Sequence, residues 1–121
     1  MTPTIDVARG FTALMAEGRF EEAGEKYWAS DVTSVETVDL PDGIPALVRG
    51  IEAVREKAKI WFGVSRIEDL KMDGPYVNGD QFTLLMDMVI VTRASGERRP
   101  FKEIALFTVR DGKIVEERYF Y

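Results

Sequence analysis

The hydrophobic pattern of this 121-residue chain changes its period once, near residue 65. Before that point, apart from one run rich in Val and Thr, apolar residues recur at a spacing of three or four, which predicts amphipathic helices. After it they alternate with polar residues in runs bounded by Gly, Asn and Asp, which predicts strands joined by tight turns. Helices followed by an antiparallel meander indicate an α+β domain with its helices packed on one face of a bent sheet.

Three segments carry the helical pattern. The first covers residues 2–18 and the second residues 19–30, and the glycine between them predicts a helical hairpin. The third covers residues 51–64, with Ile51, Val54, Ala58 and Trp61 on its apolar face. The charged residues of this helix, Lys57 among them, are expected on the face that water covers.

Five segments are predicted to be strands: residues 31–40, 65–74, 79–93, 98–110 and 113–121. The Asp-Gly pair between the last two is a strong signal for a hairpin. Residues 41–50 contain two prolines and two glycines and are predicted to form a loop. Because no repeat, linker or low-complexity stretch interrupts the chain, residues 1–121 are expected to form a single domain.

The composition excludes several kinds of chemistry and partner. The chain has no Cys and no His, which rules out Cys nucleophiles, Ser-His-Asp triads and the usual zinc sites. Its net charge is −5 and its basic residues are scattered, so binding to nucleic acid is not expected. No apolar run is long enough to span a membrane, and the first residues lack a signal-peptide core. We therefore expect a cytoplasmic protein that needs no metal and no cofactor.

Two glutamates attract attention because they lie among apolar residues on separate predicted strands. Glu36 is near the end of the strand 31–40, and Glu103 shares a strand face with Phe101, Ala105, Phe107 and Val109. A buried carboxyl must be paired, protonated or used in chemistry. If both face one cavity, they are candidates for proton transfer. Two plainer interpretations are an exposed strand end for Glu36 and an ion pair with Arg118 for Glu103.

The long strand 79–93 has two different faces. One face is wholly apolar and is expected to pack against the helices; it consists of Phe82, Leu84, Met86, Met88 and Ile90. The other face is mixed, with Thr83, Leu85, Asp87, Val89 and Val91. It is too apolar for free exposure to water, so we predict that it forms a homodimer interface, in which Asp87 makes a polar contact.

Three segments resemble nuclear transport factor two-like domains of the SnoaL-like and ketosteroid-isomerase-like kind: "FTALMAEGRFEEAGEKYWASDV", "VRGIEAVREKAKIWF" and "FTVRDGKIVEERYFY". The resemblance covers essentially the whole chain. It implies a cone-shaped, curved antiparallel sheet wrapped by three helices, the cystatin-like α+β barrel. It also implies an opening at one end over a deep apolar pocket, and dimers formed through the sheet.

Comparison with ketosteroid isomerases implies roles for individual residues. Glu36 falls at the position of the base and Glu103 at that of the protonated acid. Phe11 falls at the position of the oxyanion tyrosine but has no hydroxyl, and loss of one such donor costs about 3–4 kcal/mol of transition-state stabilisation. The residues expected to contact a ligand are Phe11, Tyr27, Trp61, Phe82, Leu84, Met86 and Tyr119. Tyr27 and Trp61 also fit a purely structural place in the core, and Tyr121 is an alternative to Tyr119 as a hydroxyl donor.

Three functions fit these features. In the first, Glu36 abstracts an acidic proton from a small apolar carbonyl compound, and a neutral Glu103 donates a hydrogen bond to the enolate. Proton transfer of this kind can catalyse isomerisation, aldol-type cyclisation and dehydration. In the second, the pocket binds an apolar small molecule without changing it. In the third, both carboxyls form ion pairs and the domain serves only to dimerise.

Overall fold

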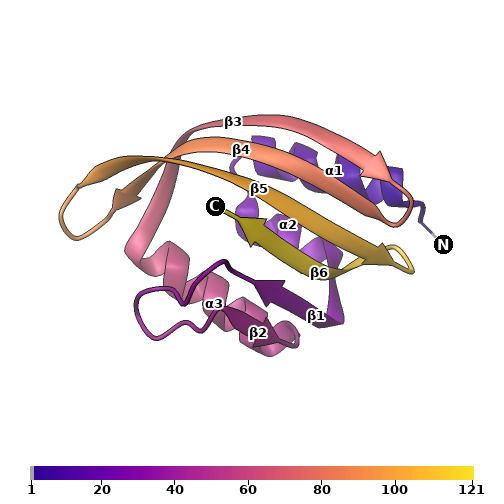
Figure 1. Ribbon diagram of the computed structural model, residues 1–121, viewed down its shortest axis with the longest axis horizontal. Coiled ribbons are helices and arrows are strands. Elements are labelled where there is room, and N and C mark those ends of the chain that lie inside the picture. The colour runs from indigo at the N-terminus through magenta and orange to yellow at the C-terminus, as the bar shows by residue number, and fades with distance from the viewer. Residues whose placement is uncertain (1) are drawn as a thin grey trace.

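The computed structural model describes residues 2–121 (Figure 1). Within them lie the helices α1 (Thr4–Ala16), α2 (Phe20–Tyr27) and α3 (Ile51–Val64). The strands are β1 (Trp28–Val35), β2 (Leu47–Arg49), β3 (Ser65–Asn78), β4 (Gln81–Thr92), β5 (Arg98–Arg110) and β6 (Lys113–Phe120). The predicted α+β class is confirmed. None of the helices in this described part of the chain combines the length and the apolar character needed to cross a membrane.

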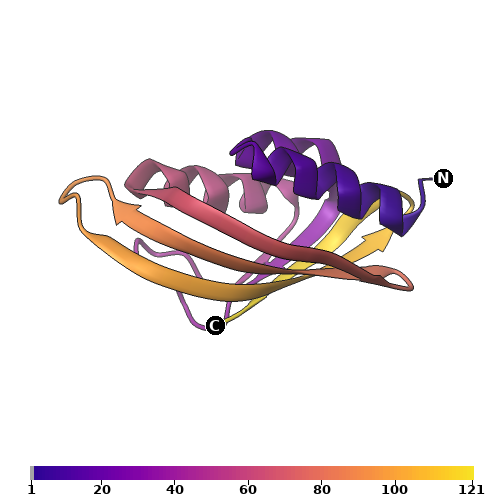
Figure 2. The same ribbon diagram turned by 90° about the horizontal axis from the view of Figure 1, so that it is seen from above.

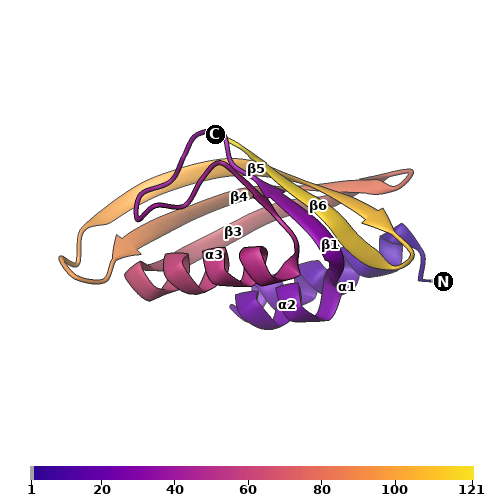
Figure 3. The same ribbon diagram turned by 90° about the horizontal axis from the view of Figure 1, so that it is seen from below.

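The strands form one curved sheet in the order β2-β1-β6-β5-β4-β3. All three helices lie on its concave side, as Figures 2 and 3 show from two directions. The sheet does not close into a barrel, because β2 and β3 remain at opposite edges. Every neighbouring pair is antiparallel except β1 and β6, which run parallel. That pairing differs from the purely antiparallel sheet predicted, and it arises because both strands start at the same end of the sheet, where Trp28 lies opposite Ile114.

The structure corrects several predicted boundaries, among them that of the strand predicted over residues 31–40, which is β1 and ends at Val35. The segment 41–50 is not wholly loop, because Leu47–Arg49 pair with the end of β1 and form β2. The second helix ends at Tyr27 rather than at residue 30, and Trp28 already belongs to β1. Strand β3 continues past Gly74 to Asn78, with a shift of register between Asp73 and Tyr76 that accommodates the Gly-Pro pair.

The core fills part of the space between the helices and the sheet. The predicted apolar face of β4 is confirmed, since Phe82, Leu84, Met86, Met88 and Ile90 are all buried. Phe11 of α1 packs against two rings of the sheet, with centroid distances of 6.1 Å to Phe82 and 4.9 Å to Phe107. Full burial of one such side chain contributes about 1.5–3 kcal/mol. The remaining space under the sheet is a cavity.

Candidate functional site

The cavity has a volume of about 330 Å³ and lies between α2, α3 and the concave face of the sheet. Aromatic side chains dominate its walls, among them Phe11, Phe20, Trp28, Trp61, Phe62 and Phe101. A largely apolar hollow of this size, with a few polar groups, is typical of a site for a small organic molecule. In the residues 2–121, no group of three or more acidic, His or Cys side chains is placed to hold a metal ion.

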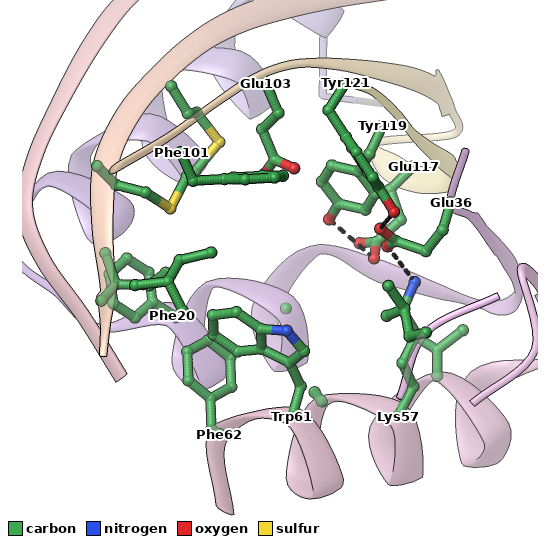
Figure 4. A pocket seen from close by; sticks show the side chains of 18 of the residues that line it. Phe20, Glu36, Lys57, Trp61, Phe62, Phe101, Glu103, Glu117, Tyr119 and Tyr121 are labelled. Atoms are coloured by element: carbon green, nitrogen blue, oxygen red, sulfur yellow. Dashed lines mark hydrogen bonds and ion pairs between the residues drawn. The ribbon is translucent and has the colours of Figure 1, made fainter. Parts of the chain in front are cut away.

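An ion pair between Glu36 and Lys57 lies at one end of the cavity (Figure 4). The Lys57 Nζ is 2.6 Å from Glu36 Oε2 and 2.6 Å from the Ser34 Oγ. The side chains of Glu36 and Lys57 are each only 9% exposed. Glu36 therefore does not lie at an exposed strand end.

The burial of Lys57 overturns the expectation that it lies on the water-covered face of its helix. Val54, Lys57 and Trp61 follow one another at spacings of three and four, so they share the inward face of α3. This spacing is the feature of the sequence from which the inward position of Lys57 could have been recognised. Lys57 was instead predicted to be solvated together with the other charged residues of the helix, and lysines are indeed almost never fully buried unless they are paired.

Glu117 of β6 is a second buried carboxyl at this end, and it was not among the predicted site residues. Its Oε1 accepts a hydrogen bond from Trp28 Nε1 at 2.8 Å. Its Oε2 accepts from Ser34 Oγ at 2.8 Å and from the Tyr119 hydroxyl at 3.0 Å. These three donors satisfy the carboxyl, as burial of a polar group requires.

Ser34 joins the two carboxyls into one network, because its hydroxyl accepts from Lys57 and donates to Glu117. The Tyr121 hydroxyl donates to Glu36 Oε1 at 3.0 Å and extends the network at its other end. We call these residues the polar network: Ser34, Glu36, Lys57, Glu117, Tyr119 and Tyr121. They come from the end of β1, from α3 and from the last strand, so the parallel pairing of β1 and β6 brings them together.

Both tyrosines of the polar network remain hydrogen-bond donors at neutral pH. Burial raises the pKa of Tyr119 well above its ordinary value, and the charge of Glu117 raises it further. Burial and the charge of Glu36 raise the pKa of Tyr121 to about 12. The sequence left open which tyrosine reaches the pocket, and in the structure both line it.

Glu103 faces the same cavity from β5, beside Tyr119 and Tyr121 of the polar network (Figure 4). Among residues 2–121 no side chain donates a hydrogen bond to it or forms an ion pair with it. The alternative partner Arg118 lies on the other face of the sheet and pairs with Glu116 at 3.4 Å. Loss of hydration, followed by the charge of Glu36, raises the pKa of Glu103 to about 7, although Lys57 acts in the opposite direction. Near neutral pH this carboxyl is partly protonated.

The structure places the predicted ligand contacts in two groups. Phe11, Trp61, Met86 and Tyr119 line the cavity together with the two predicted catalytic glutamates. Tyr27, Phe82 and Leu84 do not line it, and their assignment as ligand contacts is corrected. Phe82 and Leu84 are fully buried in the core, and Tyr27 packs edge-on against Phe11 at 6.2 Å. Alternation along β4 identified which side chains face the helices, but not at which point along the strand the core ends and the cavity begins. The cavity is bordered by the residues farther along the strand, Met86, Met88 and Ile90.

A curved sheet that carries three helices on its concave side, over an apolar hollow, defines the nuclear transport factor two-like class of proteins. The family model for the SnoaL-like domain matches residues 1–121. The chain belongs to this SnoaL-like family. A comparison with curated proteins finds no match.

Several solved structures are similar to this chain. A Mesorhizobium loti protein assigned as a SnoaL-like polyketide cyclase is 38% identical, with a TM-score of 0.89, and the match covers 99% of this chain and 100% of that one. A Xanthomonas campestris protein of unknown function with a cystatin-like fold is 21% identical, with coverages of 98% and 90% and a TM-score of 0.81. A Jannaschia protein, also assigned as a SnoaL-like polyketide cyclase, is 19% identical, with coverages of 99% and 88% and a TM-score of 0.76. The last two similarities show the fold alone.

Proposed function

We propose that this protein catalyses cofactor-free proton transfer on a small, neutral, enolisable carbonyl compound. One observation carries the proposal: Glu103 faces an apolar cavity, has no partner among the described side chains, and has a pKa of about 7. A general acid–base catalyst works best when its pKa lies near the working pH. Glu103 would accept a proton from the carbon next to the carbonyl group, and the electron pair of the broken C–H bond would move to the carbonyl oxygen.

The polar network supplies donors for the negative charge that develops on that oxygen. An ammonium group has three N–H donors, and two of those on Lys57 are directed at Glu36 and Ser34. Because Lys57 lines the cavity, the third would donate to an enolate oxygen bound there. Preorganised donors of this kind contribute about 3–4 kcal/mol each to transition-state stabilisation. Lys57 would thus supply the hydrogen-bond donor that Phe11 cannot supply, because Phe11 has no hydroxyl group.

This proposal reverses the roles that the resemblance implied for the two glutamates. Both oxygens of Glu36 already accept hydrogen bonds, one from Lys57 and one from Tyr121. Proton abstraction by Glu36 would have to disrupt the ion pair, whereas Glu103 can accept a proton without breaking any contact. We therefore assign proton transfer to Glu103 and the positioning of Lys57 to Glu36.

After enolate formation, Glu103 would return its proton to a different carbon in an isomerisation. In an aldol-type cyclisation the enolate carbon would instead attack a second carbonyl group, with Glu103 delivering the proton to the new alkoxide. Among these reactions, the similarity to the Mesorhizobium loti protein assigned as a polyketide cyclase supports the cyclisation. The apolar walls also support the alternative, a protein that binds such a molecule without changing it.

The test is exchange of the acidic carbon-bound protons of neutral naphthyl ketones for deuterium, followed by NMR in D2O. The native protein is expected to accelerate exchange, and Glu103→Gln to lower the rate about 100-fold. Glu116→Gln, on the outer face of the same sheet, is the matched control and should leave the rate unchanged. Binding without exchange in the native protein would favour the non-catalytic alternative, and full activity of Glu103→Gln would overturn the assignment.

We also propose that the convex face of the sheet forms a homodimer. Leu85, Ile104 and Phe120 lie in register on three neighbouring strands and are 40%, 47% and 49% exposed. The helices cover only the opposite face (Figure 2). Contiguous exposed apolar residues of this kind mark an interface.

Light scattering is expected to give twice the chain mass of 13.7 kDa for the native protein and the single mass for Ile104→Asp. This substitution introduces a carboxylate charge, which dimerisation would bury at the centre of the interface. The free-energy cost of burying an unpaired charge is expected to exceed the gain from association. Ile104→Val is the control and should remain dimeric. A native protein that is monomeric at high concentration would refute the interface.

A further inference from the structure

A second hollow, of about 560 Å³, lies beside the cavity. The loop between α1 and α2, the last turn of α3 and the first residues of β3 form its walls. Four basic side chains line it, Arg19, Lys59, Arg66 and Arg93, against the two acidic side chains Glu21 and Glu22. On a protein with a net charge of −5, this is a local reversal of sign. We call this hollow the basic groove.

Two of the four basic groups are already neutralised by carboxylates. Arg19 pairs with Glu22, and Arg66 pairs with Glu68 at 2.7 Å. Lys59, in contrast, makes no hydrogen bond or ion pair with any other side chain of the described chain, and it is exposed.

Arg93 is held in place but is not neutralised. Its Nε donates to the Phe62 carbonyl oxygen at 2.9 Å, which fixes the guanidinium against the end of α3. Within residues 2–121 its other two nitrogens have no hydrogen-bond partner. A fixed guanidinium with open donors, together with an ammonium group, is the arrangement that binds phosphate or carboxylate.

The basic groove and the cavity share a wall, since Phe20, Glu21, Phe62 and Ile67 line both. Phe20 and Phe62 stack with their ring centroids 5.6 Å apart and an interplanar angle of 7°. Figure 4 shows this pair at the opposite end of the cavity from the polar network. A molecule that contacts Lys57 with its reactive part and is long enough to span the cavity would therefore reach the groove.

The charges inside the cavity make the two ends chemically different. Five carboxyls and two basic groups line the cavity, and three of these residues are exposed to water: Glu21, Asp39 and Arg99. The part that is shielded from water holds the carboxyls of Glu36, Glu103 and Glu117 and the ammonium group of Lys57. A second anionic group on the ligand would be repelled there, because like charges interact strongly where water is excluded. The basic groove, which shares a wall with the cavity, carries positive charge instead.

We propose that the ligand is an amphiphile, with a neutral apolar part in the cavity and an anionic group of the phosphate or carboxylate type bound by Lys59 and Arg93. The inference extends the proposed function by naming the second end of the molecule, and it depends on that function only for the nature of the reactive end.

The test compares two naphthyl ketones that carry the same short flexible linker, one ending in phosphate and the other in a hydroxyl group. Their dissociation constants are measured by calorimetry at low salt. The native protein is expected to bind the phosphate compound about tenfold more tightly, since two partly exposed ionic contacts each contribute a few-fold. High salt should shrink this ratio.

The double variant Lys59→Gln/Arg93→Gln is expected to reduce the ratio to about one and to leave binding of the hydroxyl compound unchanged. Lys59→Gln alone, which preserves the contact between Arg93 and Phe62, should reduce the ratio to about threefold. Lys102→Gln makes the same change of charge on the convex face and should have no effect. A ratio near one in the native protein, or an unchanged ratio in the double variant, would overturn the proposal.

Binding is measured without turnover, so the two proposals fail separately. A phosphate preference that survives in Glu103→Gln supports the groove even if no proton exchange is ever observed. Proton exchange without any phosphate preference removes the groove and leaves the assignment of Glu103 intact.

Discussion

Replacement of Lys57 by Met is expected to lower the free energy of unfolding by about 3–5 kcal/mol, the usual cost of removing one partner from a buried ion pair. Met fills much of the space of the lysine stem but cannot neutralise the Glu36 carboxylate, which is only 9% exposed. The Tyr121 hydroxyl would remain as its donor, and the Ser34 oxygen would lose one. Because domains are typically stable by only about 5–15 kcal/mol, this loss is severe.

Urea unfolding followed by fluorescence of the two tryptophans measures the effect. Lys59→Met, two residues away in the same helix and exposed, is the matched control and should change stability by no more than about 0.5 kcal/mol. Adding Glu36→Gln to Lys57→Met should restore most of the loss, because the uncompensated charge is removed. A cost below about 1 kcal/mol for Lys57→Met would show that water reaches the pair in solution.

The stability of the native protein is expected to fall as the pH rises from 4.5 to 7. The pKa of Glu103 is raised from 4.5 to about 7 in the folded protein. Between these values the folded state binds a proton that the unfolded state has lost, so each increase in pH favours unfolding. Integrated over the interval, the effect is about 3 kcal/mol, and it saturates above the folded pKa, where both states are ionised.

Glu103→Gln is expected to remove this slope and to be about 3 kcal/mol more stable than the native protein at pH 8. The pKa values of Glu25 and Glu68 are lowered by hydrogen bonds from Arg55 and Arg98, respectively. Their contribution has the opposite sign and is lost only as the pH falls below 4.5, outside this window. Unfolding curves measured at several pH values separate the two effects, and parallel slopes for the native protein and the variant would contradict the role of Glu103.

The fold was largely predictable from local pattern. A helix buries one stripe and a strand one face, so the change of period near residue 65 marked the boundary between the two kinds of element, and the apolar face of β4 followed directly. Strand β2 was missed because three residues between prolines and glycines carry too little pattern. The parallel neighbour of β1 was missed because no local feature of a strand names its partner.

The site was predictable only in part, because local pattern does not reveal which residues distant in the sequence come into contact. Glu36 and Glu103 were recognisable as carboxyls among apolar residues, and both line the cavity. Lys57 and Glu117 were harder to find, since each is buried by partners that lie far away in the sequence. Which carboxyl is paired and which is left without a partner depends on those distant contacts, so the roles of the two glutamates could not be ranked from sequence.

The parallel pairing of β1 with β6 has a consequence for the order in which this molecule folds. Ser34 and Glu117 lie 83 residues apart in the sequence, whereas β3, β4 and β5 are joined by short turns. Closing so long a loop carries an entropic cost before any contact compensates it, so distant pairings are slow to form. The meander is therefore expected to assemble early and the last strand to dock late. A compound that touches Glu117 would then bind only the finished domain and would act as a pharmacological chaperone for it.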